Sequence, residues 1–228
     1  MDTGSRSYAL STSLKSESTR KFRNKNRLKS IFPILLIILS LNLISSEGGT
    51  QGELIPFEKG EKWGYRAGEG KVIIQPQFIV ANEFSSGGIA AVVDDKGWAY
   101  IDQRGNTVIR PFIFDNGPDY FEEGLARFTM DSKFGFFDET GKIVIKPEFD
   151  FALPFHEGLA PVCIGCKPMP EGEHYSMEGG KWGYTNREGE MVIPPGFDSV
   201  KRFENGKAQV KLNGQWVFID KRGKVVSY

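Results

Sequence analysis

The chain has 228 residues, of which 39% are hydrophobic and 25% charged, with 29 basic and 29 acidic side chains. This mixture is typical of a globular protein and excludes a disordered or collagen-like chain. The charges are unevenly placed, because residues 1–30 hold eight basic and two acidic side chains, which leaves 21 basic and 27 acidic ones in residues 31–228. Nucleic-acid affinity comes largely from neutralising phosphates, so an acidic body argues against a nucleic-acid partner.

Residues 1–46 are predicted to be an export segment. Basic residues between Lys15 and Lys29 precede an apolar run at 31–44, which small and polar residues follow. This order is typical of a secretory signal peptide. Fourteen helical residues span about 21 Å, short of a hydrocarbon core of about 30 Å. We therefore expect a cleaved signal and an exported protein, in the periplasm, the cell envelope or the medium. The alternative is an uncleaved membrane anchor formed by residues 31–44, which would be the chain's only membrane contact.

Residues 53–228 are predicted to be one domain built from a repeated unit of about 35 residues. Each unit is marked by an aromatic anchor, at Trp63, Trp98, Phe134, Trp182 and Trp216. Seven residues after each anchor stands a glycine, at Gly70, Gly105, Gly141, Gly189 and Gly223. Thirteen residues after the first four anchors stands a proline, at Pro76, Pro111, Pro147 and Pro195. One interval between anchors is longer than the others, and it contains an insertion at 163–177.

Each unit is predicted to form three antiparallel strands. The anchor segment is aromatic and β-branched, and it usually ends in Asp-x-x-Gly, where Asp closes the turn and Gly adopts a positive φ. The apolar return strand ends at the proline, which cannot donate a hydrogen bond to a neighbouring strand. No segment after residue 50 has a helical period. The sequence therefore predicts an all-β fold of about five three-stranded meanders in tandem, either a propeller-like ring or an open twisted stack.

Two of the anchor segments carry a family resemblance. Lys62-Trp63-Gly64-Tyr65 and the equivalent segment at 181–184, with their glycine turns and proline strand ends, resemble the bacterial WG-repeat (KWG-repeat) family. The resemblance extends over residues 54–226 and departs from the motif at Ala99, Phe134 and Val217. It implies the repeat architecture and an interaction role, since the family is a set of repeat modules without a general assigned activity.

The anchors and the loop phenylalanines are predicted to fill the core. Stacked repeats must bury a shared face, so one aromatic side chain per repeat is expected between neighbours. The alternative is that the anchors are platforms on which a ligand stacks. The aspartates of the turns are expected to close those turns, because they lack the alternating spacing of a calcium loop.

The insertion contains both cysteines of the chain, Cys163 and Cys166, and both histidines lie nearby, at His156 and His174. A local disulfide or plain thiols are the favoured interpretation. A zinc or soft-metal site formed by these four residues is an alternative, and a redox Cys-x-x-Cys pair is another. His156 is weak as a ligand, because it occupies a loop position that holds glutamate in sister repeats.

No catalytic group of residues is evident. The chain has two histidines, no G-x-S-x-G elbow and no glycine loop that would cradle a phosphate. We therefore expect no catalytic activity and no cofactor, and favour an exported repeat protein that binds another protein or an envelope component. The alternatives are a metal- or thiol-binding module centred on Cys163 and Cys166, and a cell-envelope β-repeat hydrolase, which would need converging carboxylates.

Overall fold

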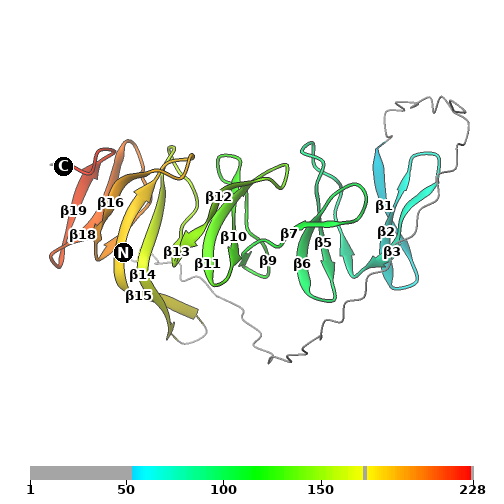
Figure 1. The fold of residues 1–228 in the computed structure, drawn as a ribbon, viewed down its shortest axis with the longest axis horizontal. Helices are drawn as coiled ribbons and strands as arrows, with labels where there is room; N and C mark the ends of the chain where they lie inside the picture. The colour runs from blue at the N-terminus through cyan, green and yellow to red at the C-terminus, as the bar shows by residue number, and fades with distance from the viewer. Residues whose placement is uncertain (1–52, 172–173, 227–228) are drawn as a thin grey trace, which may run out of the picture. The chain divides into compact units, whose positions relative to one another are not determined.

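The computed structural model describes residues 53–171 and 174–226, and every regular element in these residues is a β-strand. Small antiparallel sheets are formed by consecutive stretches of the chain, as the colours of Figure 1 show. This architecture confirms the predicted all-β fold of tandem antiparallel meanders. The ring and the open twisted stack both stay predictions, and the export segment predicted for residues 1–46 lies outside the described residues.

Five meanders account for most of the strands. In each meander a first strand pairs with an anchor strand, which pairs in turn with a return strand. The first strands are β1 (Leu54–Lys59), β5 (Ala90–Asp94), β10 (Leu125–Met130), β14 (Ala160–Glu171) and β18 (Lys207–Leu212). The anchor strands are β2 (Lys62–Ala67), β6 (Gly97–Ile101), β11 (Lys133–Asp138), β15 (His174–Thr185) and β19 (Gln215–Asp220). The return strands are β3 (Val72–Phe78), β7 (Thr107–Ile109), β12 (Ile143–Phe149), β16 (Met191–Phe197) and β20 (Val225–Val226).

Short strands that the repeat pattern did not predict follow the return strands. β4 (Val80–Ala81), β13 (Phe151–Ala152) and β17 (Ser199–Val200) each pair with the next first strand, so three sheets have four strands. After β7 the chain instead folds on itself, because β8 (Ile113–Phe114) pairs with β9 (Gly117–Pro118). This small hairpin takes the place of a fourth strand in front of β10.

The glycine that follows the anchor in three repeats is required by the close approach of the return strand. A Cβ on Gly64 would lie 2.5 Å from the carbonyl oxygen of Ile74, and the same approach recurs at Gly183. The repeats with Ala99 or Val217 at this position have return strands of only three and two described residues, against seven in the others. The glycine directly after the anchor therefore allows a long return strand to pass the anchor.

One polar side chain closes the turn between the anchor strand and the return strand. Asp102, Asp138, Asn186 and Asp220 share this position, and each accepts hydrogen bonds from the backbone N–H groups two and four residues further on. The turn then needs a positive φ, and values between 77° and 90° occur at Gly70, Gly105, Gly141, Gly189 and Gly223. The Asp-x-x-Gly pattern is thus a local device that builds the hairpin.

The turn glycine also forms the contact between successive repeats. The position that its Cβ would take faces a branched side chain on the return strand of the repeat before it. The contacts are Gly105 with Ile74 at 3.1 Å, Gly189 with Ile145 at 3.3 Å, Gly223 with Ile193 at 3.0 Å, and Gly141 with Val108 at 2.6 Å. Each turn is therefore seated on its neighbour, and a larger residue would push the two repeats apart.

A second aromatic residue, two positions after the anchor, fills the core more consistently than the anchor itself. It packs against the loop phenylalanine that follows in the chain. The ring centroids are 4.8 Å apart for Tyr65 and Phe84, 5.8 Å for Tyr100 and Phe121, 4.8 Å for Phe136 and Phe155, and 4.9 Å for Tyr184 and Phe203. The expectation that the loop phenylalanines act as core residues agrees with these contacts.

The buried apolar side chains fall into separate clusters. One cluster extends from Leu54 to Ile101, and a larger one extends from Phe112 to Ile219. A small third cluster joins the second and third meanders, because it contains Ile109 of β7 and Phe137 of β11. The described core therefore consists of three apolar clusters.

We expect Gly183→Ala to lower the free energy of unfolding by about 1–3 kcal/mol, because its methyl group would overlap the backbone at Ile193, Pro194 and Pro195. Ala99→Gly, at the same position of another repeat, is the matched control and should cost no more than about 1 kcal/mol. Urea unfolding followed by tryptophan fluorescence compares the two variants. Equal stability of Gly183→Ala and the parent would contradict the steric explanation.

Burial raises the pKa of Asp138, but hydrogen bonds from the Thr140 hydroxyl and from the Thr140 and Lys142 N–H groups outweigh it and hold the pKa below its usual value. A carboxylate with a lowered pKa stabilises the fold above its unfolded pKa of about 3.9, and this contribution is lost as the pH falls through the folded value. We therefore expect Asp138→Ala to cost about 1 kcal/mol at pH 7 and progressively less below about pH 4.

Asp138→Asn is the control for this effect, because Asn186 closes the equivalent turn with an amide oxygen. It should cost less than Asp138→Ala at pH 7 and should make the protein less sensitive to acid than the parent. Both variants are measured by thermal unfolding between about pH 3 and pH 7, a range that includes the pKa of a carboxyl group. A cost for Asp138→Ala that does not change with pH would exclude the charged carboxylate as its source.

Candidate functional site

The predicted aromatic anchors do not all lie in the core. Phe134 and Trp182 are buried, Trp63 and Trp98 are half-buried, and Trp216 is 46% exposed. Three anchors stand opposite a phenylalanine of the return strand, whereas β20 contains no residue opposite Trp216. The expectation that every anchor fills the core is therefore wrong for Trp216, because the return strand described there does not reach it.

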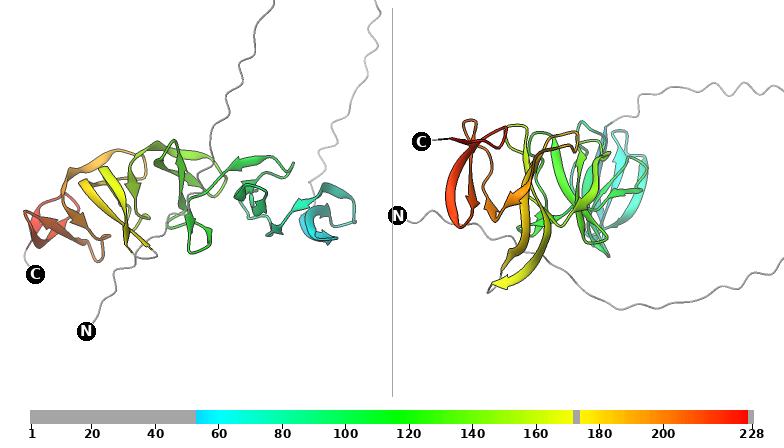
Figure 2. Two further views of the ribbon diagram at one scale, coloured as in Figure 1. Left: turned by 90° about the horizontal axis from the view of Figure 1, so that it is seen from below. Right: turned by 60° about the vertical axis from the view of Figure 1, so that its left-hand side comes forward.

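The insertion predicted at 163–177 prolongs the hairpin of β14 and β15. Both strands have 12 residues, against five or six in the other first and anchor strands, and they extend past the neighbouring strands (Figures 1 and 2). Pairing continues in one register from Ala160 opposite Thr185 to Glu171 opposite His174, and it is interrupted where Gly165 faces Gly180. The insertion is thus ordinary antiparallel structure added beyond the point where a sister hairpin turns.

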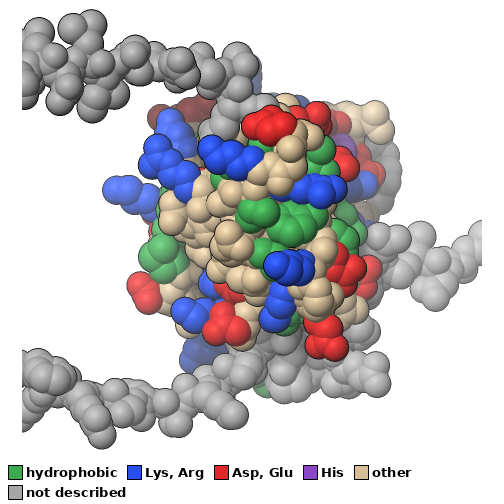
Figure 3. Space-filling view, turned by 90° about the vertical axis from the view of Figure 1, so that its right-hand side faces the viewer, with side chains coloured by type: hydrophobic (Ala, Val, Ile, Leu, Met, Phe, Trp, Pro, Cys, Tyr) green, Lys and Arg blue, Asp and Glu red, His purple; other side chains and the backbone are tan. Residues whose placement is uncertain are grey.

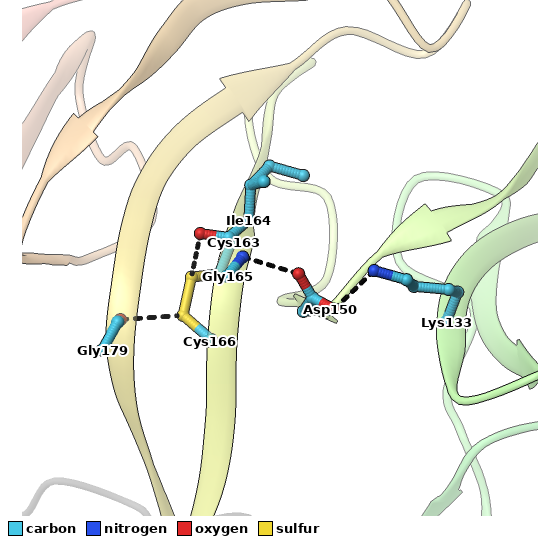
Figure 4. The surroundings of a disulfide bond; sticks show 7 residues. All are labelled: Lys133, Asp150, Cys163, Ile164, Gly165, Cys166 and Gly179. Carbon is cyan, nitrogen blue, oxygen red and sulfur yellow. Dashed lines mark hydrogen bonds and ion pairs between the residues drawn. A yellow bond between two sulfur atoms is a disulfide. The ribbon is translucent and has the colours of Figure 1, made fainter.

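Cys163 and Cys166, on either side of Gly165, form a disulfide within a single strand (Figure 4). Both cysteines are buried, and Asp150 of the preceding loop holds the backbone at Gly165 in place. The Asp150 carboxylate accepts a hydrogen bond of 2.6 Å from the Gly165 N–H and forms an ion pair of 2.5 Å with the Lys133 ammonium. Burial raises the pKa of Asp150, but the Lys133 and Gly165 hydrogen bonds outweigh it and lower the pKa.

The same ion pair recurs in the next repeat, where Lys181 lies 2.5 Å from Asp198. There, the aspartate also accepts the backbone N–H of Gly214, in the turn between β18 and β19. Gly165 therefore occupies the place at which a normal repeat has its turn, and the prolonged part of the hairpin begins after it.

The residues considered as metal ligands are not brought together. His156 lies in the loop before β14, where its Nδ1 is 2.6 Å from the carbonyl oxygen of Phe203 and, since a carbonyl only accepts, must donate to it. The cysteines are joined to each other, and the side chain of His174 lies outside what the structure describes. Within residues 53–171 and 174–226, no group of three or more His, Cys, Asp or Glu residues could hold a metal ion.

A buried ion pair, which the repeat pattern gave no reason to expect, joins Arg127 to Asp119. Both side chains are at most 2% exposed, and Asp119 accepts hydrogen bonds from Nη2 at 2.6 Å, from Nε at 2.8 Å and from the Arg127 backbone N–H at 2.9 Å. Nη1 donates to the carbonyl oxygen of Ala152 at 2.9 Å, and the guanidinium lies over the ring of Phe112 at 4.9 Å.

This pair is a structural element and offers no free group for chemistry, because both its charges are compensated inside the core. Its position follows from two departures from the repeat. Arg127 replaces an uncharged residue of β5, β14 or β18, and the segment from Pro111 to Phe121 is two residues longer than its equivalents. The charged residue at position 127 and the longer segment are the two signals in the sequence that could have revealed this ion pair.

A hollow of about 320 Å³ gathers functional groups from several repeats. It is lined by Asn82, Glu83, Ser85, Ser86, Ile89, Ala91, Tyr100, Phe121 and Glu139. These residues come from the loop between β4 and β5, from β5 and β6, from the loop before β10 and from the turn after β11. We call this feature the junction hollow.

Tyr100 is the most unusual residue of the junction hollow. In sister repeats the hydroxyls of Tyr65 and Tyr184 donate to the carbonyl oxygens of Asn82 and Lys201, both at 2.7 Å. The Tyr100 hydroxyl has no such partner among the described residues. Burial raises the pKa of Tyr100, and the nearby charge of Asp119 raises it further. The hydroxyl is therefore held as a neutral donor and acceptor.

The WG containing repeat family model matches residues 68–98, 98–134, 134–167 and 182–216, which is more than half of the chain. The interval between the last two matches, 168–181, belongs to the prolonged part of the hairpin β14–β15. No curated protein matches the chain.

We expect Arg127→Met to lower the free energy of unfolding by about 3–5 kcal/mol, because it leaves Asp119 buried without a counterion. The double variant Arg127→Met/Asp119→Leu should recover much of that loss, since it removes both charges. Arg110→Met, which breaks a partly exposed pair with Asp94, is the control and should cost about 1 kcal/mol or less. Urea unfolding measures all three; a double variant no more stable than Arg127→Met would contradict this account.

Proposed function

Because the chain belongs to the WG containing repeat family, we propose that it is an exported, non-catalytic repeat protein that binds another protein or an envelope component through the surfaces of its repeats. The observation that carries this proposal is a set of exposed apolar side chains on the return strands, which we call the apolar row. It consists of Val72, Ile143, Met191 and Val225, nine residues after their anchors, and of Val108, Val144 and Val192, ten residues after theirs, all between 36% and 52% exposed.

The row lies where a partner has access to backbone as well as side chains. Every return strand is at the edge of its sheet, so its outer N–H and C=O groups have no neighbouring strand in that sheet. Exposed apolar residues on an edge strand are unfavourable in a protein that binds nothing, and they are typical of contact surfaces. At the β1–β3 end, which faces the viewer in Figure 3, apolar side chains are gathered among charged ones.

The prolonged hairpin gives the binding proposal a second surface. Ile164 and Met169 are exposed on β14, on either side of Gly165. Methionine is common at binding surfaces because its flexible side chain adapts to different partners. A hairpin of this length that served only the fold would not need apolar residues on its exposed part.

The export part of the proposal is supported by two separate features. The basic residues and the apolar run at 31–44 have the order of a signal peptide. The disulfide between Cys163 and Cys166 belongs to an oxidising compartment, since cytosolic thiols are kept reduced. In the described part of the chain, no helix is long and apolar enough to cross a bilayer.

A hydrolase is the second candidate function, because the junction hollow contains two carboxylates, Glu83 and Glu139. Both side chains are exposed. A carboxyl group that acts as a general acid near neutral pH is usually kept protonated by burial. The exposure of both groups therefore favours a binding role over hydrolysis.

The proposal is tested by cross-linking the tagged full chain in its own cells and identifying the proteins that co-purify. Ile143→Lys should reduce the recovered partner severalfold, because it places a charge in the apolar row. Thr107→Lys is the matched control, since Thr107 is an exposed polar residue at the same distance from its turn glycine. It should leave recovery unchanged.

Circular dichroism and thermal unfolding must show that both variants are folded like the parent. Equal recovery with the two variants would show that the apolar row is not the contact surface. A tagged chain found only in the cytoplasmic fraction would contradict export.

A further inference from the structure

The junction hollow exists because one junction between repeats lacks the side chain that closes the others. In the loops before β14 and β18, Gly158 and Gly206 donate their N–H groups to the carboxylates of Glu123 and Glu157, both at 2.9 Å. Each of these glutamates belongs to the loop one repeat earlier, so it bridges two repeats. The first loop of this series has Gly87 at the equivalent place, directly before a glycine with positive φ.

A side chain could not be restored at Gly87 without moving the backbone. A Cβ there would overlap the carbonyl oxygen of Glu139, in the turn after β11. The loop from Phe84 to Ile89 is also one residue longer than its sister loops, and the added residue is a serine. Close backbone contact on one side and a longer loop on the other therefore leave an open space between three successive repeats.

The floor of this space is apolar and aromatic. Ile89 and Ala91 are buried, and the ring of Tyr100 packs at 5.8 Å from Phe121 and at 5.6 Å from Phe137. These contacts fix the ring before any ligand arrives. A fixed aromatic ring attracts a cation over its face, most strongly where water is partly excluded.

The rim of the junction hollow carries negative charge and hydrogen-bond acceptors. Glu83 and Glu139 contribute two carboxylates, and Asn82, Ser85 and Ser86 contribute neutral oxygen atoms. None of the nine lining residues is basic. An anionic ligand would therefore meet repulsion without compensation, whereas a primary ammonium group, with three N–H donors, would find acceptors on several sides.

We propose that the junction hollow binds an alkylammonium group, with the alkyl chain against Ile89, Ala91 and the aromatic rings and the nitrogen near Glu83 and Glu139. Its volume lies at the small end of ligand sites, which suits one linear amine and not a folded peptide. The alkylammonium group belongs either to a free diamine or to the side chain of a lysine. The site is independent of the apolar row on the return strands, so it stands whether or not that row binds a partner.

The test is an NMR titration of the purified, isotope-labelled full chain. The probes are cadaverine, as the free diamine, and Nα-acetyl-lysine N-methylamide, as the lysine side chain; 1,5-pentanediol is the uncharged control of similar length. We expect at least one amine to shift the amide signals of Ser85, Ser86 and Gly87, and the diol to leave them unchanged. Tighter binding of the lysine derivative assigns the group to a protein side chain, and tighter binding of cadaverine assigns it to a free amine.

Charge-neutral variants separate the site from general attraction to an acidic protein. Glu83→Gln/Glu139→Gln should raise the dissociation constant roughly tenfold, as expected for the loss of two exposed charge interactions. Glu188→Gln removes an exposed carboxylate elsewhere and should leave the constant unchanged. The proposal is overturned if neither amine shifts the three signals, if the diol shifts them equally, or if the double variant binds the amines as tightly as the parent.

Discussion

The contact between the turn glycine of one repeat and a branched side chain of the repeat before it is the constraint on which the array depends. A glycine is needed there twice, once for the positive φ of the hairpin and once for the space that the neighbouring side chain occupies, as Gly105 and Ile74 illustrate. Because one residue meets both needs, the fold of a repeat and its attachment to the previous repeat cannot vary separately. The stability of such an array is a sum over repeats and the contacts between neighbours.

Against this regular background, the features that offer chemistry or contact lie where the repeat changes length. One added loop residue and Gly87 open the junction hollow, and two added residues before Phe121 provide the aspartate that pairs with Arg127. The prolonged hairpin adds paired residues between Gly165 of β14 and Gly180 of β15. In each place the common framework stays intact, so a local change in length alters the surface without changing the fold.

The sequence predicted the parts of this structure that are repeated. The spacing of aromatic, glycine and proline residues was enough for the strands, the turns and the family, because each mark has a local physical cause. It was not enough for features that depend on a pair of distant residues. The partner of Arg127, the exposure of Trp216 and the opening beside Tyr100 are decided by what stands opposite in space. The spacing of residues along the chain does not show which side chains face each other at a junction where the repeat changes length.

The second and third meanders are joined by the smallest of the three apolar clusters. The residues from Leu54 to Ile101 share one set of buried contacts and those from Phe112 to Ile219 share another, and the cluster that contains Ile109 and Phe137 lies between the two sets. Tyr100 and Phe121 pack against this small cluster and also line the junction hollow. A molecule bound in the junction hollow would contact residues of both meanders, so its binding free energy would add to the contacts that hold them together.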